Sequence, residues 1–140
     1  MLFICFRFAM KNYQIEDNPH KGNKGITRAF RAAINSWNGL IYAFKEESAF
    51  RQELALSLVL IPLAIYLPVT PIEKILLIAS VILVLIIELL NSSVEAAIDR
   101  ISFEVHDLSK RAKDFGSAAV MLALLLCALT WVIILSGHYL

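Results

Sequence analysis

The chain has 140 residues, of which 59% are hydrophobic and 18% are charged, and its mean hydropathy is +0.69. This apolar share exceeds the roughly 45 to 50% of ordinary soluble domains, so the composition predicts one small membrane protein. Thirteen basic and twelve acidic residues leave a formal net charge of +1. No nucleic-acid partner is therefore expected.

Residues 1–24 are expected to form a flexible leader before a membrane domain at residues 25–140. The opening segment MLFICFRFAM has an arginine within its apolar run, and no small-residue cleavage site follows it. It is therefore not expected to act as a signal peptide. A translation start at Met10 is an open alternative, which would leave the polar segment MKNYQIEDNPHKGNKG as the leader.

An amphipathic surface helix is predicted over residues 25–45. Apolar residues recur there at helical spacing, while Arg28, Arg31, Asn35 and Asn38 fall on the other side. Basic side chains opposite Trp and Phe are typical of a helix that lies in the membrane interface plane.

Three spanning helices are predicted at about residues 48–67, 71–99 and 111–136. Each approaches or exceeds the roughly 20 residues that a helix needs to cross a bilayer. Between the first two spans, Thr70, Pro71 and Glu73 match a helix start with a capping box. The predicted fold class is thus an all-α membrane protein with three transmembrane helices and an N-terminal amphipathic surface helix.

The basic residues predict the orientation of these spans. Lys and Arg are concentrated before the first span and between the second and third, whereas the first loop holds only Lys74. By the positive-inside rule, the N-terminus and the second loop are cytoplasmic and the C-terminus is periplasmic. The charged ends of all three spans are then expected to meet on the cytoplasmic side.

The second span carries a polar stripe within an apolar helix. Glu88, Asn91, Ser92, Glu95 and Asp99 follow one another at intervals of three or four residues, so they share one helix face. Ionisable groups inside a membrane mark a functional site by default, because they are costly there unless they are paired or hydrated. Polar contacts between helices would explain the amide and the hydroxyl but explain three carboxylates poorly.

These residue types favour phosphate chemistry. Carboxylates beside an asparagine are hard oxygen ligands, which suit Mg²⁺. Lys110 and Lys113 at the start of the third span add the cations that neutralise a transferring phosphoryl group. A Gly-rich loop of the GxxxxGK type is absent from the sequence, which excludes a P-loop enzyme.

Three segments carry a resemblance to a known family: EESAFRQE at 46–53, IELLNSSVEAAIDRIS at 87–102 and LSKRAKDFGSAAV at 108–120. They closely resemble the prokaryotic integral-membrane diacylglycerol kinases, over about Gly25 to Ser136. The resemblance implies a homotrimer in the bacterial inner membrane, with active sites shared between subunits. It also implies Mg²⁺-dependent transfer of the γ-phosphoryl group of ATP to diacylglycerol, which gives phosphatidate.

The resemblance also implies roles for individual residues. Glu88 is the implied general base, and Glu47 and Glu95 are the implied ligands of the metal and of the ATP phosphates. Further ATP contacts are implied at Arg28, Asn35, Glu104, Val105, His106, Lys113 and Asp114. Asn91 and Asp99 are implied to shape the site. Lipid contacts are implied at Glu88 and at Ala32, Ala33, Ile34, Asn35, Ser36, Trp37, Ile41, Tyr42, Ala43, Phe44, Ala49, Phe50, Arg51, Gln52, Glu53 and Ser117.

Two positions depart from the family pattern, since Asn35 replaces an expected aromatic residue and Val105 replaces the usual Tyr or His. The lipid is also open at this stage, because a similar fold phosphorylates undecaprenol. Arg100 and the segment DFGSAAV favour the diacylglycerol branch. A small transporter remains an alternative, although the sequence lacks the repeated halves typical of one. A membrane assembly protein without catalysis is a third hypothesis.

Overall fold

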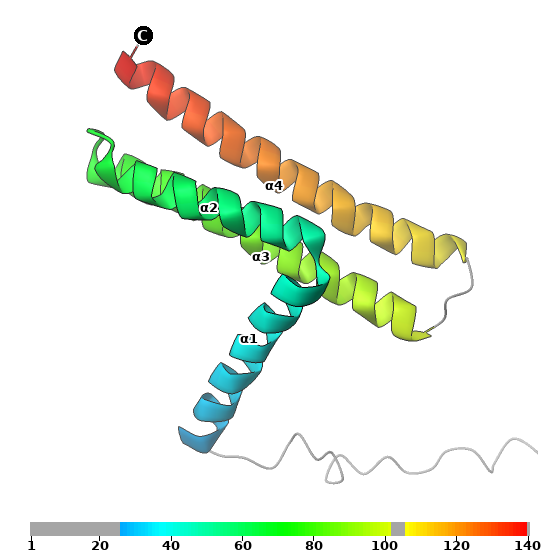
Figure 1. Ribbon diagram of the computed structural model, residues 1–140. Coiled ribbons are helices and arrows are strands. Elements are labelled where there is room, and N and C mark those ends of the chain that lie inside the picture. Colours follow the sequence, from blue (N-terminus) through cyan, green and yellow to red (C-terminus); the bar gives the residue numbers. More distant parts are fainter. Residues whose placement is uncertain (1–25, 102–105, 140) are drawn as a thin grey trace, which may run out of the picture. The chain divides into compact units, whose positions relative to one another are not determined.

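The computed structural model describes residues 26–101 and 106–139, and they form four helices joined by short connections (Figure 1). The predicted leader lies outside the described residues. Three of the helices are long and apolar enough to cross a membrane, which confirms the predicted all-helical class with three candidate spans. The helices are α1 (Ile26–Glu46), α2 (Ser48–Tyr66), α3 (Pro71–Ile101) and α4 (Asp107–Tyr139).

The chain divides into two compact units, and the boundary falls within α1 after Gly39. The described part of the first unit is a single helical segment, in which Ser36 Oγ donates a hydrogen bond to the Ala32 carbonyl at 3.0 Å. The second unit begins at Leu40 and holds the end of α1 together with the other three helices.

Helix α3 packs against both α2 and α4, and the three helices run side by side with alternating direction (Figure 1). Polar contacts along α3 and α4 define their register. Glu73 Oε2 lies 3.2 Å from His138 Nε2 at one end, Ser80 Oγ lies 3.6 Å from Cys127 Sγ further along, and Asp99 meets Lys113 at 2.6 Å near the other end. The start of α2, the end of α3 and the start of α4 therefore share one end of the unit.

The buried apolar core lies in the opposite half, next to the turn between α2 and α3. Leu77 is fully buried at its centre, where small and large side chains from all three helices interlock. Large apolar side chains elsewhere on these helices are exposed, as expected for surfaces that face lipid or other subunits. The core residues are Ala64, Val69, Leu77, Val81, Trp131 and Ile134.

The predicted capping box at the start of α3 is confirmed. The backbone N–H groups of Thr70 and Glu73 each donate to the other residue's side chain, at 2.8 Å to Glu73 Oε2 and 3.3 Å to Thr70 Oγ1. Pro71 occupies the first helical position, where its missing N–H costs nothing. Lys74 Nζ donates to the Ile65 carbonyl at 2.6 Å, so the same turn also satisfies the end of α2.

Replacing Thr70 with alanine is expected to destabilise the protein by about 1 kcal/mol, because an N-cap hydroxyl is lost. The acid-rich end of the three helices lies at the other end of α3, so its geometry should not change. Thermal unfolding of the detergent-solubilised protein measures the first effect. Thr70→Ser, which keeps the hydroxyl, should unfold like the wild type, and equal losses from both variants would show that the cap contributes nothing.

Candidate functional site at the charged end of the helices

Three other carboxylates lie within electrostatic range of Glu88. Glu88 on α3 is within electrostatic range of Glu47 and Glu95, and Glu53 on α2 is within range of Glu88. Glu88 is the most enclosed of them, with only 4% of the residue exposed. Like charges repel in a low-dielectric setting, so a cation near these acids would lower their repulsion.

Glu47 reaches the cluster from the junction between α1 and α2. It occupies the N-cap position of α2 with an extended backbone (φ −98°, ψ 113°), and its side chain makes no capping hydrogen bond. Arg51 braces this junction, because its Nη1 atom donates to the carbonyls of Phe44 and Lys45, each at 3.1 Å. The carboxylate of Glu47 is therefore not used to cap its own helix.

Two polar contacts involve the C-terminal part of the predicted polar stripe on α3. Asn91 Nδ2 donates to Glu95 Oε1 at 3.0 Å, one helical turn away. Lys113 on α4 pairs with Asp99 at 2.6 Å and also acts electrostatically on Glu95. A lysine from α4 thus lies beside the carboxylates of α3.

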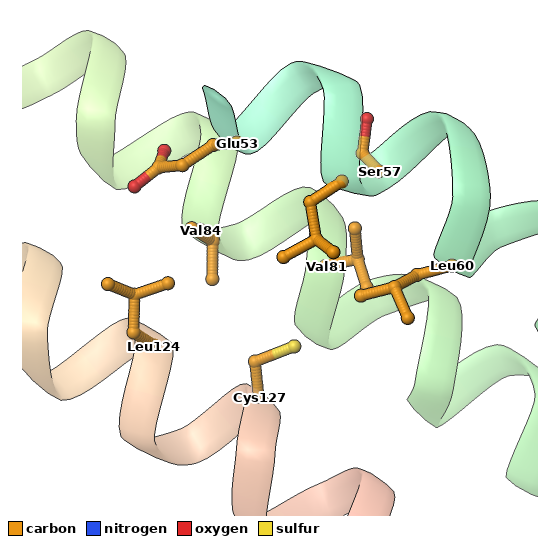
Figure 2. Close-up of a pocket in the computed structure, with 8 residues that line it drawn as sticks. Glu53, Ser57, Leu60, Val81, Val84, Leu124 and Cys127 are labelled. Atoms are coloured by element: carbon orange, nitrogen blue, oxygen red, sulfur yellow. The ribbon is translucent and has the colours of Figure 1, made fainter. Parts of the chain in front are cut away.

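A small cavity lies between the three helices beside Glu53 (Figure 2). Glu53, Val84 and Leu124 are grouped at one end of it, while Val81, Leu60 and Cys127 lie toward the other. At about 30 Å³, the cavity has room for ordered water but not for an acyl chain. Glu53 Oε2 is buried and lacks a hydrogen-bond partner in this structure, so it is an available acceptor.

The described residues include no group of three or more His, Cys, Asp or Glu side chains positioned to hold a metal ion together. Zinc-type sites need such a group, whereas Mg²⁺ commonly takes one or two carboxylates and completes its shell with water and substrate phosphates. Glu47 and Glu95 offer carboxylate oxygens of that kind near a third acid. The chemistry of the donors therefore fits Mg²⁺.

The remaining residues with implied nucleotide contacts divide into three groups. The first group is His106 and Asp114, near the start of α4. His106 accepts a hydrogen bond at Nδ1 from the Leu108 N–H at 3.2 Å and so caps that helix. Asp114 is exposed two turns further along. Arg28 and Asn35 belong to the first unit. Glu104 and Val105 lie outside the described residues.

The residues with implied lipid contacts also fall in several places. Residues 32–37 belong to the first unit, while residues 41–44 and 49–53 flank the junction in the second. Ala43 and Phe50 are buried at 7% and 2% exposure, whereas Tyr42, Phe44 and Ser117 are exposed. The exposed members are the ones that a lipid could reach directly.

Two contacts outside the carboxylate site were not predicted. The bonds from Arg51 to the end of α1 depend on the bend between two helices, and the pairing of Glu73 with His138 depends on antiparallel packing across 65 positions. The first contact joins Arg51 to residues six and seven positions earlier, on the preceding helix. The second had no local signal, because residues so distant meet only through tertiary packing.

Three long apolar helices, with clustered acids and a lysine at one shared end, define a polytopic α-helical membrane protein with a carboxylate-lined site. Residues 34–135 match the family model of prokaryotic diacylglycerol kinase. The chain is 50% identical over 115 residues to a diacylglycerol kinase of Escherichia coli K12, covering 82% of this chain and 94% of that relative. It is 49% identical over 120 residues to one of Pseudomonas aeruginosa, covering 86% and 98%.

A diacylglycerol kinase of Helicobacter pylori is 44% identical over 117 residues, with 84% of this chain and 88% of the relative covered. The matched region includes α2, α3 and nearly all of α4. The chain belongs to the prokaryotic diacylglycerol kinase family.

Proposed function

We propose that the protein is a lipid kinase that transfers the γ-phosphoryl group of ATP to the hydroxyl of diacylglycerol, which gives phosphatidate and ADP. Membership of the family supports this activity. The observation that carries the residue-level proposal is the enclosed carboxylate of Glu88, which lies within electrostatic range of Glu47 and Glu95. An acid at this position can meet an alcohol that stays in the lipid phase.

Glu88 acts as the general base. It accepts the proton of the diacylglycerol hydroxyl while that oxygen bonds to the γ-phosphorus and the bond to the bridging oxygen of ADP breaks. Its enclosure keeps bulk water from competing as the acceptor. Lys113, held beside Asp99 and Glu95, neutralises charge on the nucleotide phosphates.

Mg²⁺ is the proposed cofactor, with Glu47 and Glu95 as its protein ligands. When bound, it would neutralise charge on the ATP phosphates. The repulsion among the clustered carboxylates and the preference of Mg²⁺ for few carboxylates support this choice. Glu53 and Asn91, each with a buried oxygen that lacks a partner, line the surroundings of these ligands.

The finer nucleotide and lipid contacts follow the family resemblance. Arg28, Asn35, His106 and Asp114, together with residues 104–105, are proposed to bind ATP. Residues 32–37, 41–44, 49–53 and Ser117 are proposed to bind the lipid, and Asp99 shapes the site through its pairing with Lys113.

The assembly and orientation are likewise proposed. The basic residues favour a cytoplasmic N-terminus and a periplasmic C-terminus in the inner membrane, with α1 as an amphipathic surface helix. A homotrimer with shared active sites agrees with the many exposed apolar side chains on all three spans. Activity measured in oligomers that mix two inactive variants tests the sharing, because complementary defects restore activity only when one site draws on two subunits.

A two-substrate assay is expected to show a preference for diacylglycerol over undecaprenol. Purified protein is incubated with labelled ATP and Mg²⁺, and either diacylglycerol or undecaprenol is added in mixed micelles. Arg100 and the segment that begins at Asp114 are the sequence features behind this expectation. A strong preference for undecaprenol would reassign the substrate and keep the kinase.

The same assay separates the enzyme from non-catalytic alternatives. A transporter or an assembly protein would not consume ATP in a manner that depends on both Mg²⁺ and an added lipid alcohol. Absence of labelled lipid with either substrate would overturn the proposed activity.

A further inference from the structure

Gly116 on α4 lies directly opposite Asn91 on α3. An ideal Cβ atom placed on Gly116 would lie 2.0 Å from Asn91 Oδ1 and 3.2 Å from Asn91 Cγ. The first distance is far inside the contact distance of carbon and oxygen. The amide of Asn91 therefore occupies the space that any other residue at position 116 would fill.

The amide orientation is set by its other neighbour. Asn91 Nδ2 donates to Glu95 Oε1 at 3.0 Å. The reversed orientation would place Oδ1 against that oxygen, which is unfavourable because both atoms are acceptors. The nitrogen thus faces Glu95, and the oxygen faces Gly116.

Moving one atom of this amide moves the other, because the group is planar. A methyl group at position 116 would displace Oδ1 and Cγ together, and Nδ2 would then leave Glu95. Such a shift of a short side chain costs the fold little. It removes the donor that orients a proposed metal-binding carboxylate, and partners of this kind influence metal affinity strongly.

We propose that Gly116 is a positioning residue for the kinase site. The space left by its missing side chain, here called the seat, holds the amide of Asn91. That amide in turn orients Glu95 for its proposed role in binding Mg²⁺ and ATP. This inference rests on the proposed function for the role of Glu95. The seat itself, formed by α3 and α4, is independent of that role. The two parts can therefore be tested separately.

Gly116→Ala is expected to raise the Mg²⁺ concentration for half-maximal activity by roughly tenfold, in line with the loss of a partner to a metal ligand. Equilibrium binding of ATP at fixed Mg²⁺ should weaken by a similar factor. Gly137→Ala is the matched control, because it makes the same change in the same helix with nothing within 4 Å of the added atom. It should leave both quantities unchanged.

A double-mutant cycle with Asn91→Ala tests the route of the effect. Because the seat matters only when the amide is present, adding Gly116→Ala to Asn91→Ala should cause no further change in Mg²⁺ dependence or ATP binding. If the double variant instead showed the two single-variant defects multiplied together, the proposal would be overturned. A Gly116→Ala enzyme with the Mg²⁺ dependence of the wild type would overturn it as well.

Thermal unfolding without Mg²⁺ or ATP tests the seat even if the kinase assignment fails. In the Asn91→Ala background, Gly116→Ala should raise the unfolding temperature, since alanine favours a helix over glycine. In the wild-type background the same change should raise it less or lower it. Equal shifts of the unfolding temperature in both backgrounds would contradict the seat. Unequal shifts in a protein that proves to lack lipid kinase activity would support the seat and overturn only the proposed role of Glu95.

Discussion

Glu88→Gln is expected to reduce the turnover of lipid phosphorylation by at least roughly a hundredfold, which is the lower range for the loss of a general base. The amide has nearly the size of the carboxylic acid but accepts no proton at neutral pH. The side chain is enclosed at 4% exposure, so water does not readily replace it as the base. Initial rates at saturating Mg²⁺, ATP and diacylglycerol measure this loss.

The same variant should keep its oligomeric state and the wild-type KM for ATP. Removal of one of several neighbouring carboxylates relieves repulsion from Glu47 and Glu95, so stability should be equal or greater. Size-exclusion chromatography and thermal unfolding provide these controls. If Glu88→Gln retained the wild-type turnover, another group would have to accept the proton.

Glu95→Gln and Glu47→Gln should each weaken the binding of Mg²⁺ and ATP by roughly tenfold or more, because an amide is a poorer ligand than a carboxylate for a hard cation. The defect should appear mainly in KM for ATP and in the Mg²⁺ concentration required. It should be partly relieved by a large excess of Mg²⁺. This pattern contrasts with Glu88→Gln, where excess metal should restore nothing.

Glu46→Gln is the matched control for Glu47→Gln, since it makes the same change at the adjacent position. Glu46 is the last residue of α1 and is exposed, whereas Glu47 occupies the N-cap position of α2 without capping it and acts electrostatically on Glu88. The control should show the wild-type Mg²⁺ dependence. Equal defects at both positions would indicate a general effect of charge at the junction and would remove Glu47 from the metal site.

Much of the architecture follows from residue pattern alone. Long apolar runs predict spans because the backbone can satisfy its hydrogen bonds in lipid only by forming helices or closed barrels. The capping box is equally local, because Thr70 and Glu73 are three positions apart. The acids of α3 fall on one face through helical periodicity, which predicts a site before any packing is known.

The composition of the site depends on how the helices pack. Asp99 and Lys113 meet across a connection, and the separation of Glu53 from Glu88 depends on the register of α2 and α3. The seat for Asn91 is the clearest case, since its two residues are 25 positions apart and meet only through the packing of α3 on α4.

Periodicity thus determines which side chains share a helix face, because a helix repeats every 3.6 residues whatever surrounds it. It carries no information on which residue of the next helix fills the facing gap. That choice depends on shape and distance between helices, as at Gly116, where the absence of a Cβ leaves room for the amide of Asn91.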